Sequence, residues 1–220
     1  MIHLRKKPNP TFNEEQKLWS RGVDYVLGTD EVGRGSFAGP VVAASVILKR
    51  KLPSILLNNI NDSKILTAKK RAILSPLIKK HSIAYSISVI NVKTIDRYGI
   101  GIATKKALRK SITDVYSKLL DSNSNNFKSH LLMDGLYVKH IRNFGLNNQK
   151  AIIKGDQISL SIAAASIIAK VYRDLIMEKL SIKYPEYKWG QNKGYGTKIH
   201  RESIYKYGLS SIHRNSFKIS

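Results

Sequence analysis

The 220-residue chain contains no cysteine and few acidic residues. Without cysteine it can form neither a disulfide framework nor a thiolate metal site, and the composition is compatible with a reducing compartment. Aspartate and glutamate number 15 against 38 lysines and arginines, which gives a formal net charge of +23. Because such a surface attracts polyanions, nucleic acid is the favoured partner. A biased coding composition is the plainer explanation for part of the lysine content.

Long hydrophobic runs are also missing. The longest apolar stretch, residues 37–48, is shorter than the roughly 20 residues that a membrane-spanning helix needs. The basic start of the chain, Met1–Lys7, is followed by a polar segment with two prolines and does not predict a secretory signal. We expect a cytoplasmic protein that acts away from membranes, and a monomer is the simplest oligomeric state.

Apolar patterning and turn residues predict an α/β fold. Strands are expected at residues 25–27, 41–48, 83–90, 131–133 and 151–153, and helices at 68–81, 94–120 and 159–184. Thr67 is placed to cap the first helix, and alanines in the last helix permit close approach to a sheet. This order predicts a mixed five-stranded sheet flanked by helices. We expect a polar lead-in over 1–22, one domain over 23–184, and a small basic helical appendage over 185–220.

Four carboxylates fall at predicted strand ends. Asp30 and Glu31 follow the first strand, and Asp134 and Asp156 follow the last two. Asp30 and Glu31 would point to opposite faces of a regular strand, but a turn at its end can bring both to one point. Carboxylates crowded together repel each other unless a divalent cation neutralises them, and oxygen ligands suit Mg²⁺ or Mn²⁺. Taken singly, each aspartate beside a glycine is also typical of an ordinary turn.

Two neighbouring features bear on this site. In Gly33-Arg34-Gly35 the glycines allow close backbone approach, and the arginine can hold a phosphate by two hydrogen bonds, although a plain tight turn is the simpler interpretation. Asp174 could be a fifth carboxylate of the site. We expect it instead to have a surface or helix-pairing role, because Arg173 is adjacent.

Six motifs resemble those of type 2 ribonuclease H, in that family's order and over nearly the whole chain. They are Gly-Thr-Asp-Glu-Val-Gly-Arg-Gly at 28–35, Asn-Asp-Ser-Lys at 61–64, Met-Asp-Gly at 133–135, Lys-Gly-Asp at 154–156, Ala-Ala-Ser-Ile-Ile-Ala-Lys-Val-Tyr-Arg-Asp at 164–174 and Lys-Gly-Tyr-Gly-Thr at 193–197. The resemblance implies a ribonuclease H-like fold. It also implies endonucleolytic cleavage of RNA in RNA·DNA hybrids, or at ribonucleotides embedded in duplex DNA.

The resemblance also implies roles for individual residues. The catalytic and metal-binding set would be Asp30, Glu31, Asp134 and Asp156, holding two Mg²⁺ or Mn²⁺ ions. Cleavage by two such ions leaves 3′-hydroxyl and 5′-phosphate ends. The substrate-binding set would be Gly33, Arg34, Gly35, Ser63, Lys64, Lys193 and Tyr195. Of these, the glycine-arginine-glycine turn would read the 2′-hydroxyl, and Tyr195 would contact the sugar at the RNA–DNA junction.

Some observations leave alternatives open. Ser36-Phe37 stands where the family often has proline-leucine, and Asn192 where histidine is frequent. Type 3 enzymes carry lysine in place of Arg34 and usually a large N-terminal substrate-binding domain, which favours type 2. Basic stretches at 49–80, with nine basic residues, and 188–220, with seven, suit backbone phosphates. A non-catalytic nucleic-acid-binding protein, or a nuclease of this fold acting on DNA junctions or ends, are the competing hypotheses.

Overall fold

The computed structural model describes residues 9–122 and 127–218, so the basic start of the chain lies outside the described part. In chain order the helices and strands are α1 (Asn13–Trp19), β1 (Tyr25–Val32), β2 (Val41–Leu48), α2 (Ser54–Asn59), α3 (Ala68–Lys80), β3 (Ser82–Ile90), α4 (Val92–Ser122), β4 (Ser129–Asp134), β5 (Gln149–Ile152), α5 (Leu160–Lys183), α6 (Trp189–Asn192) and α7 (Lys198–Tyr207). No helix within these described ranges is both long and apolar enough to cross a membrane.

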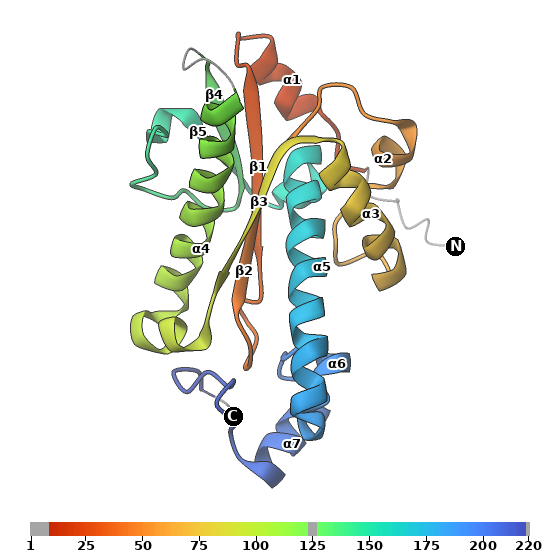
Figure 1. The fold of residues 1–220 in the computed structure, drawn as a ribbon, viewed down its shortest axis with the longest axis vertical. Coiled ribbons are helices and arrows are strands. Elements are labelled where there is room, and N and C mark those ends of the chain that lie inside the picture. The colour runs from red at the N-terminus through yellow and green to blue at the C-terminus, as the bar shows by residue number, and fades with distance from the viewer. Residues whose placement is uncertain (1–8, 123–126, 219–220) are drawn as a thin grey trace, which may run out of the picture.

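One mixed sheet with the strand order β3-β2-β1-β4-β5 organises the molecule, as predicted. β1, β2 and β3 pair antiparallel in succession, whereas β4 is parallel to β1 and β5 is parallel to β4. α4 covers one face of the sheet, and α5 with α3 covers the other (Figure 1). β2 is buried along its whole length because its alternate side chains enter these two cores.

Helix α5 lies unusually close to the centre of the sheet. A side chain at Gly28 of β1 would place its Cβ only 2.1 Å from the backbone of Ser161, so glycine is required there. The buried alanines of α5, including Ala163 and Ala164, allow the same approach further along the helix. Ser159 caps α5 and Thr67 caps α3 by accepting a hydrogen bond from a backbone amide, as the sequence predicted for Thr67. The close packing fixes α5 beside the strand that carries the first acidic pair.

The first strand is longer than predicted. It was expected to end near residue 27, with a loop from Glu31, but β1 continues through Val32. The pairing of Asp30 with Ala44 and of Glu31 with Ala43 of β2 keeps both acidic residues in the ladder. The expected turn at Asp30 and Glu31 is therefore wrong, because hydrogen bonding to a buried partner strand outweighs the low strand propensity of charged residues.

The segment before β1 also differs from the expected polar lead-in, because it contains α1. Glu15 of this helix is buried and accepts hydrogen bonds through Oε1 from the Ser159 hydroxyl and from the amide and hydroxyl of Ser161. α1 is thereby attached to the start of α5. The short helix α2 was also not predicted; its Leu56 is buried in the same core as α3 and α5.

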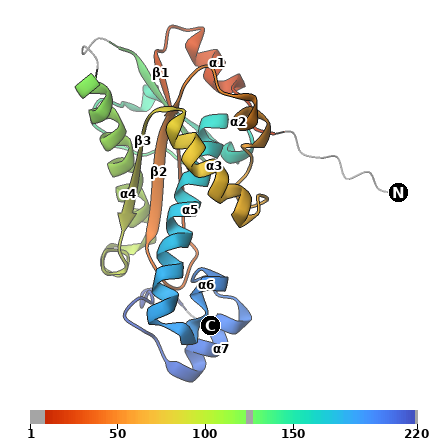
Figure 2. The ribbon, with the colours of Figure 1, turned by 45° about the vertical axis from the view of Figure 1, so that its right-hand side comes forward.

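The residues after α5 form the small helical appendage that was predicted. α6 lies beside the lower part of α5, and α7 lies near its lower end, as Figure 2 shows. Their core is aromatic: Trp189 is fully buried and stacks on Tyr187, with ring centroids 5.1 Å apart. Buried Arg214 connects this region to the end of β1, because its guanidinium donates hydrogen bonds to the carbonyls of Gly33, Arg34 and Gly39.

Candidate active site

Three aspartates converge where the parallel strands end. Asp30 is in β1, Asp134 is the last residue of β4, and Asp156 is in the 3-10 turn Gly155–Gln157 that follows β5. One carboxylate oxygen from each lies within 4.8 Å of the other two. The parallel pairing of β1, β4 and β5 brings these positions to the same edge of the sheet. The predicted convergence is confirmed for these three side chains.

Glu31 approaches this cluster from the side. With Asp134 and Asp156 it lines a cleft of about 510 Å³, and its carboxylate lies 3.3 Å from Nη1 of Arg34. The side chain of Asp30 is 7% exposed and accepts a hydrogen bond of 2.7 Å from the Glu31 amide. The Glu31 side chain is similarly buried, at 9% exposure, and lines the cleft next to the three aspartates.

Burial shifts the acidity of the cluster. Burial, and next the charge of Glu31, raise the pKa of Asp30 well above its ordinary value. Burial also raises the pKa of Glu31 and that of Asp156, although Arg34 and Lys64 respectively oppose these shifts. The protein alone therefore compensates the negative charges of these carboxyl groups only partly, and a bound cation would stabilise their ionised forms.

The donor set fits a hard divalent cation. All the converging side chains offer carboxylate oxygens, and the described residues bring no histidine or cysteine into this group. Oxygen ligands of this kind suit Mg²⁺ and Mn²⁺ rather than softer metals. The loop that carries Asp156 is fixed in place, because the Gly155 amide donates a hydrogen bond of 2.7 Å to Oδ1 of Asp134.

The Asn-Asp-Ser-Lys segment contributes a cation and a residue that the sequence analysis did not assign. Nζ of Lys64 lies 3.2 Å from Oδ2 of Asp156 while most of its side chain remains exposed. Asp62 is buried; its Oδ1 accepts from the Lys64 amide and its Oδ2 from the amide group of Gln157. Asp62 therefore links the Lys64 loop to the Asp156 loop. Its place in the same motif was the only signal in the sequence.

Two buried arginines support the glycine-arginine-glycine turn from below. Gly33 has a φ of +93°, and a Cβ at this position would lie 2.2 Å from Nε of Arg173. Arg173, on α5, donates to the carbonyls of Pro40, Ala38 and Lys193. Together with Arg214 it donates hydrogen bonds to five backbone carbonyls in residues 33–40. Arg173 was named from the sequence only within a motif and as the neighbour of Asp174, so its contacts with this loop were not predicted, nor were those of Arg214.

The remaining predicted residues lie around these groups with different surroundings. The Tyr195 ring lies over Arg173, with the guanidinium carbon 5.5 Å from the ring centroid, and its backbone bridges to Ser36 after the turn. Ser63 is buried, and its hydroxyl lies 2.9 Å from that of Ser166. Lys193 directs its ammonium to Glu178 and to the carbonyl of Gly190.

Asp174 does not join the carboxylate cluster. It pairs with Lys170 at 2.7 Å and with Arg71 at 3.4 Å, and it is largely buried between α3 and α5. The sequence favoured a surface or a helix-pairing role; the surface role is wrong because Asp174 is buried, and the ion pair with Arg71 of α3 agrees with the helix-pairing role.

Comparisons with known proteins agree with this geometry. The family model for ribonuclease HII matches residues 27–220. Ribonuclease HII of Caldicellulosiruptor bescii is 45% identical over 206 residues, which cover 94% of this chain and 92% of that protein. The crystal structure of ribonuclease H2 from Pyrococcus horikoshii OT3 has a TM-score of 0.67 at 23% identity, covering 89% of this chain and 94% of that chain. The structure of Bst-RNase HIII in complex with Mn²⁺ has a TM-score of 0.69 at 20% identity, covering 90% and 68%.

The two solved structures share the fold, and the family model and the bacterial relative match most of the sequence. These matches confirm the resemblance that the motifs indicated. They also favour the type 2 form, since both sequence-level matches carry that name. The chain belongs to the ribonuclease HII family and is a metal-dependent ribonuclease H.

Proposed function

We propose that this ribonuclease cleaves the RNA strand of RNA·DNA hybrids and also cuts at single ribonucleotides embedded in duplex DNA, leaving 3′-hydroxyl and 5′-phosphate ends. The observation that carries the proposal is the position of the carboxylate cluster. Asp30 lies three residues before Gly33, so the catalytic carboxylates adjoin a turn whose backbone a sugar edge can approach closely. This arrangement supports metal-assisted hydrolysis next to the selection of a ribonucleotide.

The metal-binding residues in this proposal are Asp30, Glu31, Asp134 and Asp156. Two divalent ions, Mn²⁺ or Mg²⁺, supply a water nucleophile and stabilise the leaving 3′-oxygen when they are bound at such a site. The Mn²⁺ complex of the structurally similar ribonuclease HIII supports this choice of ion. The protein holds the carboxylates in advance through the Gly155 and Glu31 amides, so little reorganisation is needed when a cation binds.

The substrate-binding residues divide into two groups. Gly33, Arg34 and Gly35 would read the 2′-hydroxyl and hold the adjoining phosphate, and Tyr195 would pack on the sugar. Arg34 is exposed enough to exchange Glu31 for a phosphate. Ser63, Lys64 and Lys193 would position the backbone, and of these Lys64 reaches the cleft with its ammonium already beside Asp156.

The wider setting of the enzyme forms part of the same proposal. We place it in the cytoplasm as a monomer that acts in ribonucleotide excision repair, with residues 185–220 packed on the catalytic domain. The net charge of +23 supports a duplex as the partner, because phosphate contacts provide most of the affinity of such a surface.

A cleavage assay on three duplexes tests the proposal. Wild-type protein with Mg²⁺ or Mn²⁺ is expected to cut an RNA·DNA hybrid and a DNA duplex with one ribonucleotide, but not all-DNA duplex. Asp134→Asn is expected to lose turnover by at least about 100-fold while still binding, because Asn keeps the oxygen that accepts from the Gly155 amide.

Three results would contradict the proposal. Comparable cutting of all-DNA duplex would favour a DNA nuclease of this fold. A shift of the duplex in a gel without metal-dependent cutting would favour a pure binding protein. Full activity of Asp134→Asn in both metals would remove the assigned catalytic role.

A further inference from the structure

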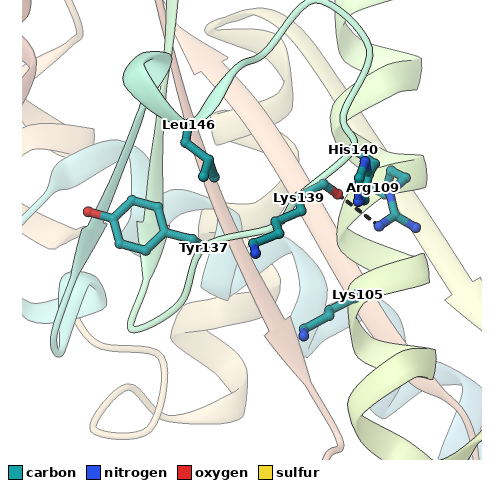
Figure 3. A pocket seen from close by; sticks show the side chains of 6 residues that line it. All are labelled: Lys105, Arg109, Tyr137, Lys139, His140 and Leu146. Carbon is teal, nitrogen blue, oxygen red and sulfur yellow. Dashed lines mark hydrogen bonds between the residues drawn. The ribbon is translucent and has the colours of Figure 1, made fainter.

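A basic pocket lies beside the active site, between α4 and the loop that follows β4. It has a volume of about 610 Å³ and is lined by Lys105, Arg109, Tyr137, Lys139, His140 and Leu146. Figure 3 shows Lys105 and Lys139 extending toward the same space, one from the helix and one from the loop. No acidic side chain lines this pocket, and within the described ranges none of its basic residues has an ion pair.

The loop that forms one wall is rigidly held. The side chain of Gln149 is buried and hydrogen bonds the amide and carbonyl of Val138 and the carbonyl of Phe144. Val138, Ile141 and Phe144 are themselves buried in the core beneath α4. The residues between them, including Lys139, are directed outward. The cationic residues of the loop are thus presented from a fixed backbone, which lowers the entropic cost of binding an anion.

The helix wall is connected to the same loop. Lys105 and Arg109 are four residues apart, so they share one face of α4. Nη2 of Arg109 donates a hydrogen bond of 2.9 Å to the carbonyl of Lys139, which is drawn in Figure 3. Its buried Nε has no acceptor among the residues that the structure describes. The guanidinium therefore ties the two walls of the pocket together.

The position of the pocket identifies the kind of anion. Tyr137 is three residues after Asp134, so its Cα lies within about 11 Å of that of the catalytic aspartate, even for an extended chain. Along each strand of a duplex a phosphate recurs for about every 3.4 Å of helix axis. A duplex whose scissile phosphate lies at the carboxylate cluster therefore carries other phosphates at the distance of this pocket.

We propose that the pocket formed by Lys105, Arg109 and Lys139 binds a backbone phosphate of the substrate duplex a few nucleotides from the cut. This inference rests on the proposed function, because it takes the duplex as the substrate. The pocket fixes the register of the duplex on the enzyme and does not read base sequence. Lys105 and Lys139 supply the point charges, and Arg109 holds the loop in place.

The test compares two double variants that remove the same charge. Lys105→Gln with Lys139→Gln removes the two ammonium groups of the pocket and leaves Arg109 to hold the loop. Lys17→Gln with Lys128→Gln is the control. Lys17 lies in α1 and Lys128 precedes β4, at the end of the sheet opposite the carboxylates. Glu14, the partner of Lys17, keeps Lys150 in the control.

The pocket variant is expected to raise KM for a hybrid or a single-ribonucleotide duplex about 5- to 10-fold with little change in kcat. The slope of log affinity against log salt should fall in magnitude by about 1, as for one lost phosphate contact. The control should change both quantities much less. Two further duplexes are shortened, one on the 5′ side and one on the 3′ side of the cut. Only one of them should lack the phosphate that the pocket binds, and on that duplex alone the pocket variant and wild type should have equal KM values.

Equal KM values and equal salt slopes for the two double variants would overturn the inference. The inference would also be overturned if the pocket variant raised KM over wild type by the same factor on both shortened duplexes as on the long duplex. If wild-type protein cuts neither ribonucleotide-containing duplex, the proposed function fails instead. The affinities of the two double variants for the duplex at several salt concentrations, measured by gel shift, still decide whether the pocket binds a phosphate.

Discussion

The ammonium group of Lys64 lies 3.2 Å from Oδ2 of Asp156, on the wall of the cleft that holds the other carboxylates. Burial lowers the pKa of Lys64, but the charges of Asp156 and further carboxylates outweigh burial and raise it overall. Lys64 is therefore a fixed positive charge within the candidate metal site. It partly neutralises Asp156, and it competes electrostatically with a divalent cation for the same carboxylate.

Replacement of Lys64 by Gln should therefore strengthen the binding of Mn²⁺ to the protein without nucleic acid. We expect an affinity gain of about three- to tenfold at pH 8, where deprotonated carboxylates are favoured. Isothermal titration calorimetry with Mn²⁺ measures it. Lys69→Gln, which removes an exposed lysine of α3, is the control and should match wild type. Equal affinities for all three proteins would mean that Lys64 does not influence the cation site.

Gly33 should tolerate no side chain. Its φ of +93° is unfavourable for alanine, and the new Cβ would overlap Nε of Arg173. We expect Gly33→Ala to lower the free energy of unfolding by about 2–3 kcal/mol, from backbone strain and displaced hydrogen bonds of Arg173. Gly35→Ala is the matched variant, since its Cβ meets no atom within 4 Å. Urea unfolding should show a much smaller change for Gly35→Ala, and similar losses for both would contradict this explanation.

Glu15 should stabilise the attachment of α1 to α5. Its Oε1 accepts three hydrogen bonds from Ser159 and Ser161 in a buried position. Glu15→Ala is expected to cost about 3 kcal/mol of unfolding free energy, because the serine hydroxyls and the Ser161 amide lose a charged acceptor. Glu14→Ala, one residue earlier, breaks the ion pairs with Lys17 and Lys150, whose side chains are both substantially exposed, and should cost only about 1 kcal/mol. Thermal unfolding of both variants measures the contrast, which an equal loss would refute.

Metal binding should depend on pH through the raised pKa values of the site. Because burial raises the pKa of Asp30, Glu31 and Asp156, part of the carboxyl groups stay protonated above the ordinary carboxylate range. A cation must displace these protons, so the affinity for Mn²⁺ should increase with pH and its binding should release protons. Calorimetry in two buffers of different ionisation enthalpy counts the released protons. A pH-independent affinity between pH 5.5 and 8 would show that the carboxyl groups are already ionised.

The buried histidine pair should make the protein less stable in mild acid. His213 and His200 lie with their Nε2 atoms 3.1 Å apart, and the Trp189 indole donates to His200. Burial, and next the charge of His200, lower the pKa of His213 to about 4. In the unfolded chain the pKa of a histidine is about 6.5, so below that pH the unfolded chain binds a proton that folded His213 does not. The free energy of unfolding is therefore highest above pH 6.5 and falls by about 3 kcal/mol as pH decreases toward 4.

Urea unfolding at pH 7.5 and pH 5 should show about 2 kcal/mol of this loss in wild type, because pH 5 lies between the two pKa values, and a smaller loss in His213→Gln. If that variant does not fold, the imidazole signals of wild type can be titrated by NMR. A His213 pKa near 6.5 would contradict the prediction.

Local sequence was sufficient for most of the elements. Each predicted element is present. The signals that predict them, such as the alternation in β3 and the cap at Thr67, involve residues close together in the sequence. The predicted end of β1 was wrong because a strand distant in the sequence determines it. Asp30 and Glu31 remain in the strand because β2 pairs with them from more than ten residues away, a contact that local propensity does not contain.

The chemical identity of the site also follows from the sequence alone. The three aspartates lie at predicted strand ends, and the motifs around them indicate the family that the family model matches. Only the tertiary structure determined how these groups meet. It brings three carboxylates within 4.8 Å of one another and places Glu31 in the wall of the same cleft. It places Lys64 at Asp156, and Arg173 and Arg214 beneath the turn at Gly33. A sequence determines which charges are available, whereas the distances between residues far apart in the chain depend on the packing of α5 and the C-terminal segment against the sheet.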